Sequence, residues 1–117
     1  MNAEQLSDPA VTRHYADVVA IDPEMLPMLQ LVQRLCAKQY ASHLPVSTSH
    51  DVLVLGTGDS ITVAYGGRTT LFQVRYCNWR GKHETHSCEA SEAERLVDSL
   101  VTRLQLSRHP SKPVSES

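Results

Sequence analysis

Apolar and polar positions along this chain follow two different spacings, which separate helices from strands. Residues 7–9, Ser-Asp-Pro, are typical of a helix start, because a capping side chain precedes a proline whose missing N–H costs nothing there. Apolar residues then recur on one helical face to about Ala20, and the Asp-Pro of residues 22–23 repeats the start signal. The pattern therefore predicts two N-terminal helices, the second of which ends near Tyr40.

The second helix carries more apolar side chains than one-sided packing needs. They spread over roughly 180° of the helix surface and comprise Met25, Met28, Leu29, Leu31, Val32, Leu35, Cys36 and Tyr40. Two interpretations stay open at this point: the helix lies between the first helix and a sheet, or part of the arc contacts another protein. On the second interpretation, we predict a protein-binding surface made of Leu26, Met28, Leu31 and Leu35.

From residue 52 to residue 87 apolar residues alternate with polar ones, as they do in half-buried strands. Turn residues divide this region into four strands, at 52–55, 60–65, 68–77 and 82–87, after a loop at 41–50. A capping box, Ser91-x-x-Glu94, then begins a last amphipathic helix. The predicted fold class is α+β, an antiparallel meander of three to four strands flanked by two N-terminal helices and one C-terminal helix.

The glycine pair at residues 66–67 is typical of a two-residue hairpin turn. A turn at this position pairs Ile61 with Phe72 and Val63 with Thr70. The apolar side chains of both strands then share one face, and the polar ones share the other. We expect one buried and one more polar sheet face.

A second predicted hairpin, closed by residues 78–81, concentrates positive charge. Its register would pair Cys77 with Lys82 and Arg75 with Glu84. The chain as a whole has a formal charge of −2, yet residues 60–87 hold four basic residues and one acidic residue. The alternative function is therefore a small nucleic-acid-binding domain that uses the basic hairpin region 60–87, with contacts from Arg75, Trp79, Arg80 and Lys82.

The length of 117 residues, with 41% hydrophobic residues, suits one domain. We assign residues 1–106 to a single α+β domain and the Pro- and Ser-rich residues 107–117 to a disordered tail. Three cysteines and an N-terminus that does not resemble a signal peptide predict a cytoplasmic protein.

The catalytic and metal-binding motifs in the sequence are incomplete. The segment Gly58-Asp59-Ser60 resembles the nucleophile block of GDSL-type esterases, but the D-x-x-H that such enzymes need is not in the sequence. The candidate metal ligands, Cys77, His83, His86 and Cys88, lack the convergent spacing of a zinc site. We predict no catalytic residue, no metal, no cofactor and no enzyme activity.

The length, the α+β pattern and the non-catalytic character resemble those of small antiactivators that bind LuxR-type quorum-sensing regulators. The resemblance covers overall size and organisation and carries over no residues. It implies a homodimer that inhibits a transcriptional activator by covering the activator's dimerisation surface, which would keep the activator off DNA.

Overall fold

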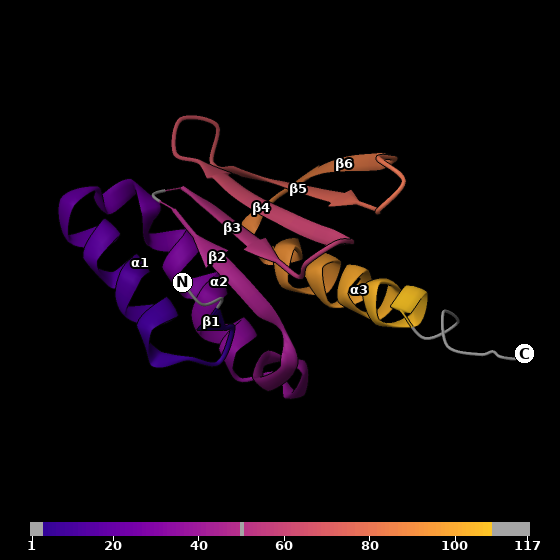
Figure 1. Cartoon of the computed structure of the whole chain (residues 1–117). Coiled ribbons are helices and arrows are strands. Elements are labelled where there is room, and N and C mark those ends of the chain that lie inside the picture. Colours follow the sequence, from indigo (N-terminus) through magenta and orange to yellow (C-terminus); the bar gives the residue numbers. More distant parts are fainter. Residues whose placement is uncertain (1–3, 50, 109–117) are drawn as a thin grey trace, which may run out of the picture.

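The computed structural model describes residues 4–49 and 51–108, which form one six-stranded sheet with helices (Figure 1). In chain order the elements are β1 (Glu4–Gln5), α1 (Pro9–Ile21), the 3₁₀ turn η1 (Pro23–Met25), α2 (Leu26–Cys36), the 3₁₀ turn η2 (Gln39–His43), β2 (Pro45–Thr48), β3 (Val52–Leu55), β4 (Ser60–Gly66), β5 (Leu71–Cys77), β6 (His83–Cys88) and α3 (Ala90–Arg108). The strands lie in chain order, and each pairs antiparallel with its neighbour. The predicted α+β meander with two N-terminal helices and one C-terminal helix is confirmed.

Local signals place most of the helix boundaries where the sequence predicts them. Asp8 caps α1 by accepting a hydrogen bond from the N–H of Ala10, and Pro9 occupies the first turn. Helix α2 ends at Cys36 and is followed by η2, so it is shorter than predicted. Helix α3 continues to Arg108, two residues into the predicted tail, and residues 109–117 of that tail lie outside the described residues.

Strand β2 was predicted as a loop, and β1 was not predicted at all. β2 has four residues and begins with proline, which sequence patterns associate with turns more than with strands. It nevertheless pairs Val46 with Leu55 of β3, and the short β1 then pairs with β2. These two strands widen the sheet on the side of the N-terminal helices.

The register of the β4–β5 hairpin differs from the predicted one. Gly66 pairs with Leu71, so the connection is a four-residue loop and the predicted two-residue turn is wrong. The observed register places Tyr65 opposite Phe72, with ring centroids 4.7 Å apart. Such a pair stabilises this register. Because the shift keeps the alternation unchanged, the predicted division into a buried and a more polar face still holds.

The β5–β6 register is shifted by one residue from the predicted one, so the predicted Arg75–Glu84 pair is also wrong. Arg75 pairs with Thr85, and Glu84 pairs with Tyr76. A one-residue shift moves each side chain to the opposite face of the sheet. Glu84 consequently lies on the helix side, where it accepts a hydrogen bond from Nη1 of Arg103 at 2.5 Å.

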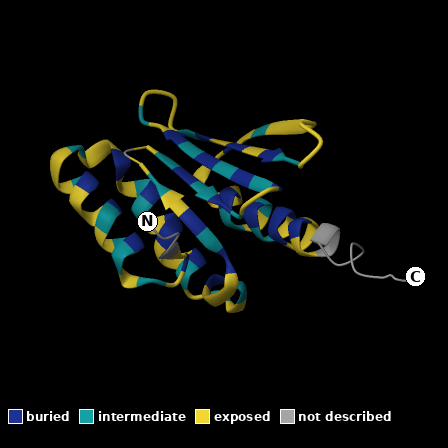
Figure 2. Cartoon of the chain, viewed as in Figure 1, coloured by how far each residue is buried: buried dark blue, intermediate teal, exposed yellow. Residues whose placement is uncertain are grey.

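The three α-helices of the described chain lie on the same face of the sheet (Figure 1). Along β4 and β5, buried residues alternate with partly or fully exposed ones (Figure 2). The buried ones belong to the same core cluster as the buried side chains of the helices. Helix α1 is joined to the sheet by the buried Tyr15, whose hydroxyl donates to the carbonyl oxygen of Val52 at 2.8 Å. Burial raises the pKa of this phenol above its ordinary value. Among the described residues, no helix is long and apolar enough to cross a membrane.

Candidate functional site

Helix α2 carries the four side chains predicted to contact a partner, and it buries three of them. Met28 and Leu35 are fully buried and Leu31 is 1% exposed, whereas Leu26 at the helix start is 43% exposed. Because α2 contacts α1, α3 and the sheet, its wide apolar arc is covered within one chain. The prediction that Met28, Leu31 and Leu35 form a partner surface is therefore wrong, and only Leu26 of the four is accessible.

The side of the sheet away from the helices is not covered by any described element (Figure 1). We call it the open face. The pairing register assigns to it Val52, Val54, Ser60, Thr62, Ala64, Leu71, Gln73, Arg75, Cys77, His83, Thr85 and Ser87, together with Pro45, Ser47 and Gly66. Half-buried side chains fill its centre on β3 and β4. On β5 and β6 most of the side chains are exposed and polar, with the half-buried Leu71 and Cys77 at the two ends of β5. None of these described strand residues is acidic, and Arg75 supplies a positive charge.

Only three of the four residues of the alternative nucleic-acid site lie together. Trp79, Arg80 and Lys82 lie together at the β5–β6 turn, whereas Arg75 lies on the open face along β5. Trp79 is 72% exposed, and the guanidinium carbon of Arg80 is 4.9 Å from the centroid of its ring. This contact presents a positive charge and an aromatic face at the same tip.

Asp59 holds this hairpin tip in place, a role that the sequence does not reveal. The carboxylate is 8% exposed; it accepts a hydrogen bond from the backbone N–H of Trp79 at 2.9 Å and one from the Tyr76 hydroxyl at 3.3 Å. The turn that carries Asp59 lies against α3. Its Gly56 is so closely surrounded that an added Cβ would meet the carbonyl oxygen of Asp59 at 2.8 Å and a methyl group of Leu104, on α3, at 3.1 Å. Within the turn motif 56–60, the buried carboxylate thus serves as an anchor for the hairpin.

The side chain of Asn78 completes the turn. Its Oδ1 atom accepts hydrogen bonds from the backbone N–H groups of Arg80 at 2.9 Å and Lys82 at 3.1 Å. Gly81 adopts a φ of 86°, in the left-handed region that favours glycine. The tip is thus a fixed structure that projects Trp79 into solvent.

The candidate metal ligands are divided between the two faces of the sheet. Cys77 pairs with His83 on the open face, whereas His86 and Cys88 lie on the helix side. Within residues 4–49 and 51–108, no three His, Cys, Asp or Glu side chains are grouped so that they could hold a metal ion. Burial raises the pKa of the Cys88 thiol, which disfavours the thiolate form that binds metals.

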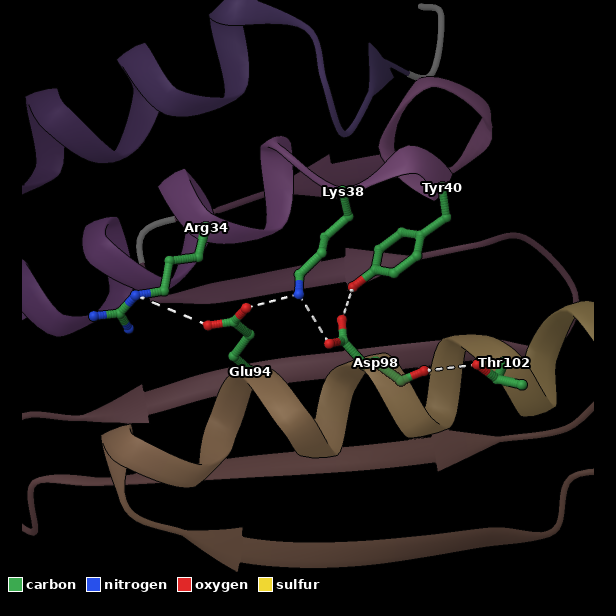
Figure 3. A network of polar contacts seen from close by, with 6 residues as sticks. All are labelled: Arg34, Lys38, Tyr40, Glu94, Asp98 and Thr102. Carbon is green, nitrogen blue, oxygen red and sulfur yellow. Dashed lines mark hydrogen bonds and ion pairs between the residues drawn. The ribbon is translucent and has the colours of Figure 1, made fainter.

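A polar network joins α2 and η2 to α3 (Figure 3). Nζ of Lys38 lies 2.7 Å from Oε2 of Glu94 and 3.0 Å from Oδ2 of Asp98. The Tyr40 hydroxyl donates to Oδ1 of Asp98 at 2.5 Å, and Arg34 lies 3.9 Å from Glu94. A depression of about 290 Å³ adjoins this network, lined by Ser91, Glu94, Arg95 and Asp98.

The ionisation behaviour of this network indicates a structural contact between helices. The hydrogen bonds to Glu94 and Asp98 raise the pKa of Lys38, and burial raises the pKa of Tyr40. A general base works best when its pKa is near neutral pH, and these two shifts move both groups further away from it. The network therefore stabilises the packing of α3 against α2.

Comparison of the chain with protein-family models, with curated proteins and with solved structures finds no match. The function is therefore inferred from the exposed surfaces of the molecule, the open face and the β5–β6 turn.

Proposed function

We propose that this protein is a non-catalytic binding protein that contacts another protein through the open face of its sheet. One observation supports the proposal above all: the helices cover one face of the sheet and leave the other uncovered. The centre of that face combines Val54, Thr62 and Ala64, side chains that lie close to the backbone and form a shallow surface. A flat apolar and hydroxyl surface of this kind suits contact with a complementary protein surface.

The positive charge at the margin of the open face defines the chemistry of the partner. Arg75 forms no ion pair with any residue that the structure describes, and the open-face residues of the neighbouring strands include no carboxylate to compete for it. A partner with an apolar centre and an acidic margin would therefore complement this face. Inhibition of a LuxR-type activator by such contact, and a cytoplasmic location, are parts of this proposal that rest on the sequence.

The proposal is tested with a matched pair of charge insertions. Ala64→Glu places a carboxylate in the centre of the open face, and Ala16→Glu places one on the exposed side of α1. Both variants are compared with the unchanged chain by crosslinking and pull-down from native lysate, after thermal melting has shown that they fold. We expect Ala64→Glu to lose the captured protein and Ala16→Glu to keep it. Equal capture by both folded variants would contradict a role for the open face.

A second candidate function is nucleic-acid binding, which the Arg80–Trp79 contact and the exposed Lys82 favour. The Tyr and Phe rings of β4 and β5 are buried, so the exposed Trp79 at the β5–β6 turn is the ring placed to stack on a base. Because phosphate contacts release counterions, such binding weakens steeply as salt is added. Titration of a fluorescent oligonucleotide at low and high salt separates the two functions. Salt-sensitive binding that is lost in Trp79→Ala would favour the second.

A further inference from the structure

The two edges of the sheet differ in length and protection. At one edge, β1 has two residues, and the chain next to it is held by a hydrogen bond from the N–H of Leu6 to the carbonyl oxygen of Leu44. At the other edge, β6 has six residues, and no described strand pairs with its outer side. Five of its six residues are exposed or half-buried (Figure 2). β6 contains no lysine, proline or bulge, three features that prevent an edge strand from pairing further, and its one carboxylate, Glu84, is paired with His86 and Arg103.

The alternation of an antiparallel ladder identifies the backbone groups on this outer side. The N–H of Asn78 donates to the carbonyl oxygen of Lys82 at 2.9 Å, so Lys82 bonds toward β5. In an unbulged ladder every second residue does the same. The residues between them, His83, Thr85 and Ser87, therefore direct their N–H and C=O groups away from the sheet.

We propose that β6 pairs antiparallel with β6 of a second copy of this chain, about a two-fold axis that passes beside Thr85. In this register Thr85 opposes Thr85 of the second copy, and His83 opposes Ser87. All three outward-facing residues of each copy then pair, which forms about six main-chain hydrogen bonds. The two sheets become one, and the two open faces become one continuous surface.

Charge complementarity favours this register. In it, Glu84 of each copy opposes His86 of the other, on the helix side of the joined sheet. These positions do not exchange ladder bonds across the new interface, so their side chains approach most closely, with Cα atoms about 4.5 Å apart. Within one chain Glu84 already lies 2.9 Å from Nε2 of His86 and also binds Arg103. The joined sheet gives each carboxylate a second imidazole and each imidazole a second carboxylate.

The neighbouring registers lack these contacts. A pairing centred on Glu84 places the two glutamates opposite each other, and one centred on His86 places the two histidines opposite each other. Each of them also aligns fewer outward-facing residues, which reduces the main-chain bonds to about four. Like charges opposite each other destabilise a strand pair, which applies to the two glutamates. Symmetry, hydrogen bonding and charge thus favour the register centred on Thr85.

The experiment exploits the fact that residue 85 opposes itself. Thr85→Lys brings two ammonium groups together at the axis, and Thr85→Glu brings two carboxylates together. Thr62→Lys is the matched control, because Thr62 lies on the same open face but on the central strand β4. The molar mass of the full chain is measured by sedimentation across a wide dilution series for each protein and for an equal mixture of the two Thr85 variants.

We expect the unchanged chain and Thr62→Lys to dimerise, and each Thr85 variant alone to dimerise with a dissociation constant roughly fivefold higher or more. The mixture of Thr85→Lys with Thr85→Glu regains dimers, because a lysine then opposes a glutamate. An unfolded variant could not be rescued in this way, so the mixture also controls for folding. A monomeric unchanged chain, a dimer unaffected by either Thr85 variant, or a mixture that stays as weak as its components would overturn the proposal.

Discussion

Helix α2 is rich in apolar side chains, most of which are buried, whereas strand β6 is mostly polar and exposed along its outer side. The difference follows from the number of neighbours. α2 is packed by α1, α3 and the sheet, and β6 pairs with only one of the described strands, β5. A broad apolar arc therefore identifies an element with several neighbours, and an accessible surface is found where the layers of the fold end.

The largest expected effect is a loss of stability when a buried side chain of α2 is shortened. Leu31→Ala removes a buried side chain from α2 and leaves a cavity, so we expect the free energy of unfolding to fall by about 2–5 kcal/mol. Leu26→Ala, at the exposed start of the same helix, is the matched control, with a loss below about 1 kcal/mol. Urea unfolding measures both. Equal losses in the two variants would show that α2 is not enclosed as described.

A smaller loss of stability is expected when Asp59, in the turn before β4, can no longer bind the exposed β5–β6 hairpin. Asp59→Ala leaves the N–H of Trp79 and the hydroxyl of Tyr76 without this carboxylate, which predicts a loss of about 1–3 kcal/mol. Asp17→Ala, on the exposed side of α1, is expected to stay within about 0.5 kcal/mol of the unchanged chain. Fluorescence of Trp79 during unfolding reports on the tip directly. Similar losses of stability in both variants would show that Asp59 does not anchor the hairpin.

The smallest expected effect is a loss of stability at high pH that depends on Tyr15. Its pKa is higher in the folded chain than its ordinary value of 10.0, because burial disfavours the phenolate. The unfolded chain therefore loses this proton first, and the stability contributed below pH 10 is lost as pH rises further. Tyr15→Phe should lower stability by about 1 kcal/mol near neutral pH and weaken this alkaline loss. Thermal melts of both proteins at a series of alkaline pH values measure this difference. If the two melting temperatures fell in parallel as the pH rose, the prediction would be wrong.

Much of the fold follows from local signals in the sequence. The Asp-Pro pairs predict where α1 and η1 begin, and the alternation of residues 60–77 predicts which side chains are buried. The register could not be predicted in this way, because it depends on contacts between side chains of different strands and turns, such as Tyr65 with Phe72 and Asp59 with Trp79. A turn motif gives the position of a hairpin and leaves its exact pairing to those contacts.

The candidate site, too, could be predicted only where it depends on local sequence. The sequence predicts Trp79, Arg80 and Lys82 at one exposed turn, and the structure brings these three together. It does not predict that α2 is covered, since the width of an apolar arc does not state how many elements pack on it. It also does not predict that all the helices lie on one face, which is what exposes the other face and the β6 edge.

Amide hydrogen exchange at low and high protein concentration tests most directly whether this molecule associates through its sheet edge or through its apolar helix. If β6 pairs with β6 of a second copy, the amides of His83, Thr85 and Ser87 exchange more slowly at high concentration, and those of α2 do not change. Exchange in β6 that is independent of concentration, or slowing confined to α2, would contradict the assignment of the contact surface to the sheet.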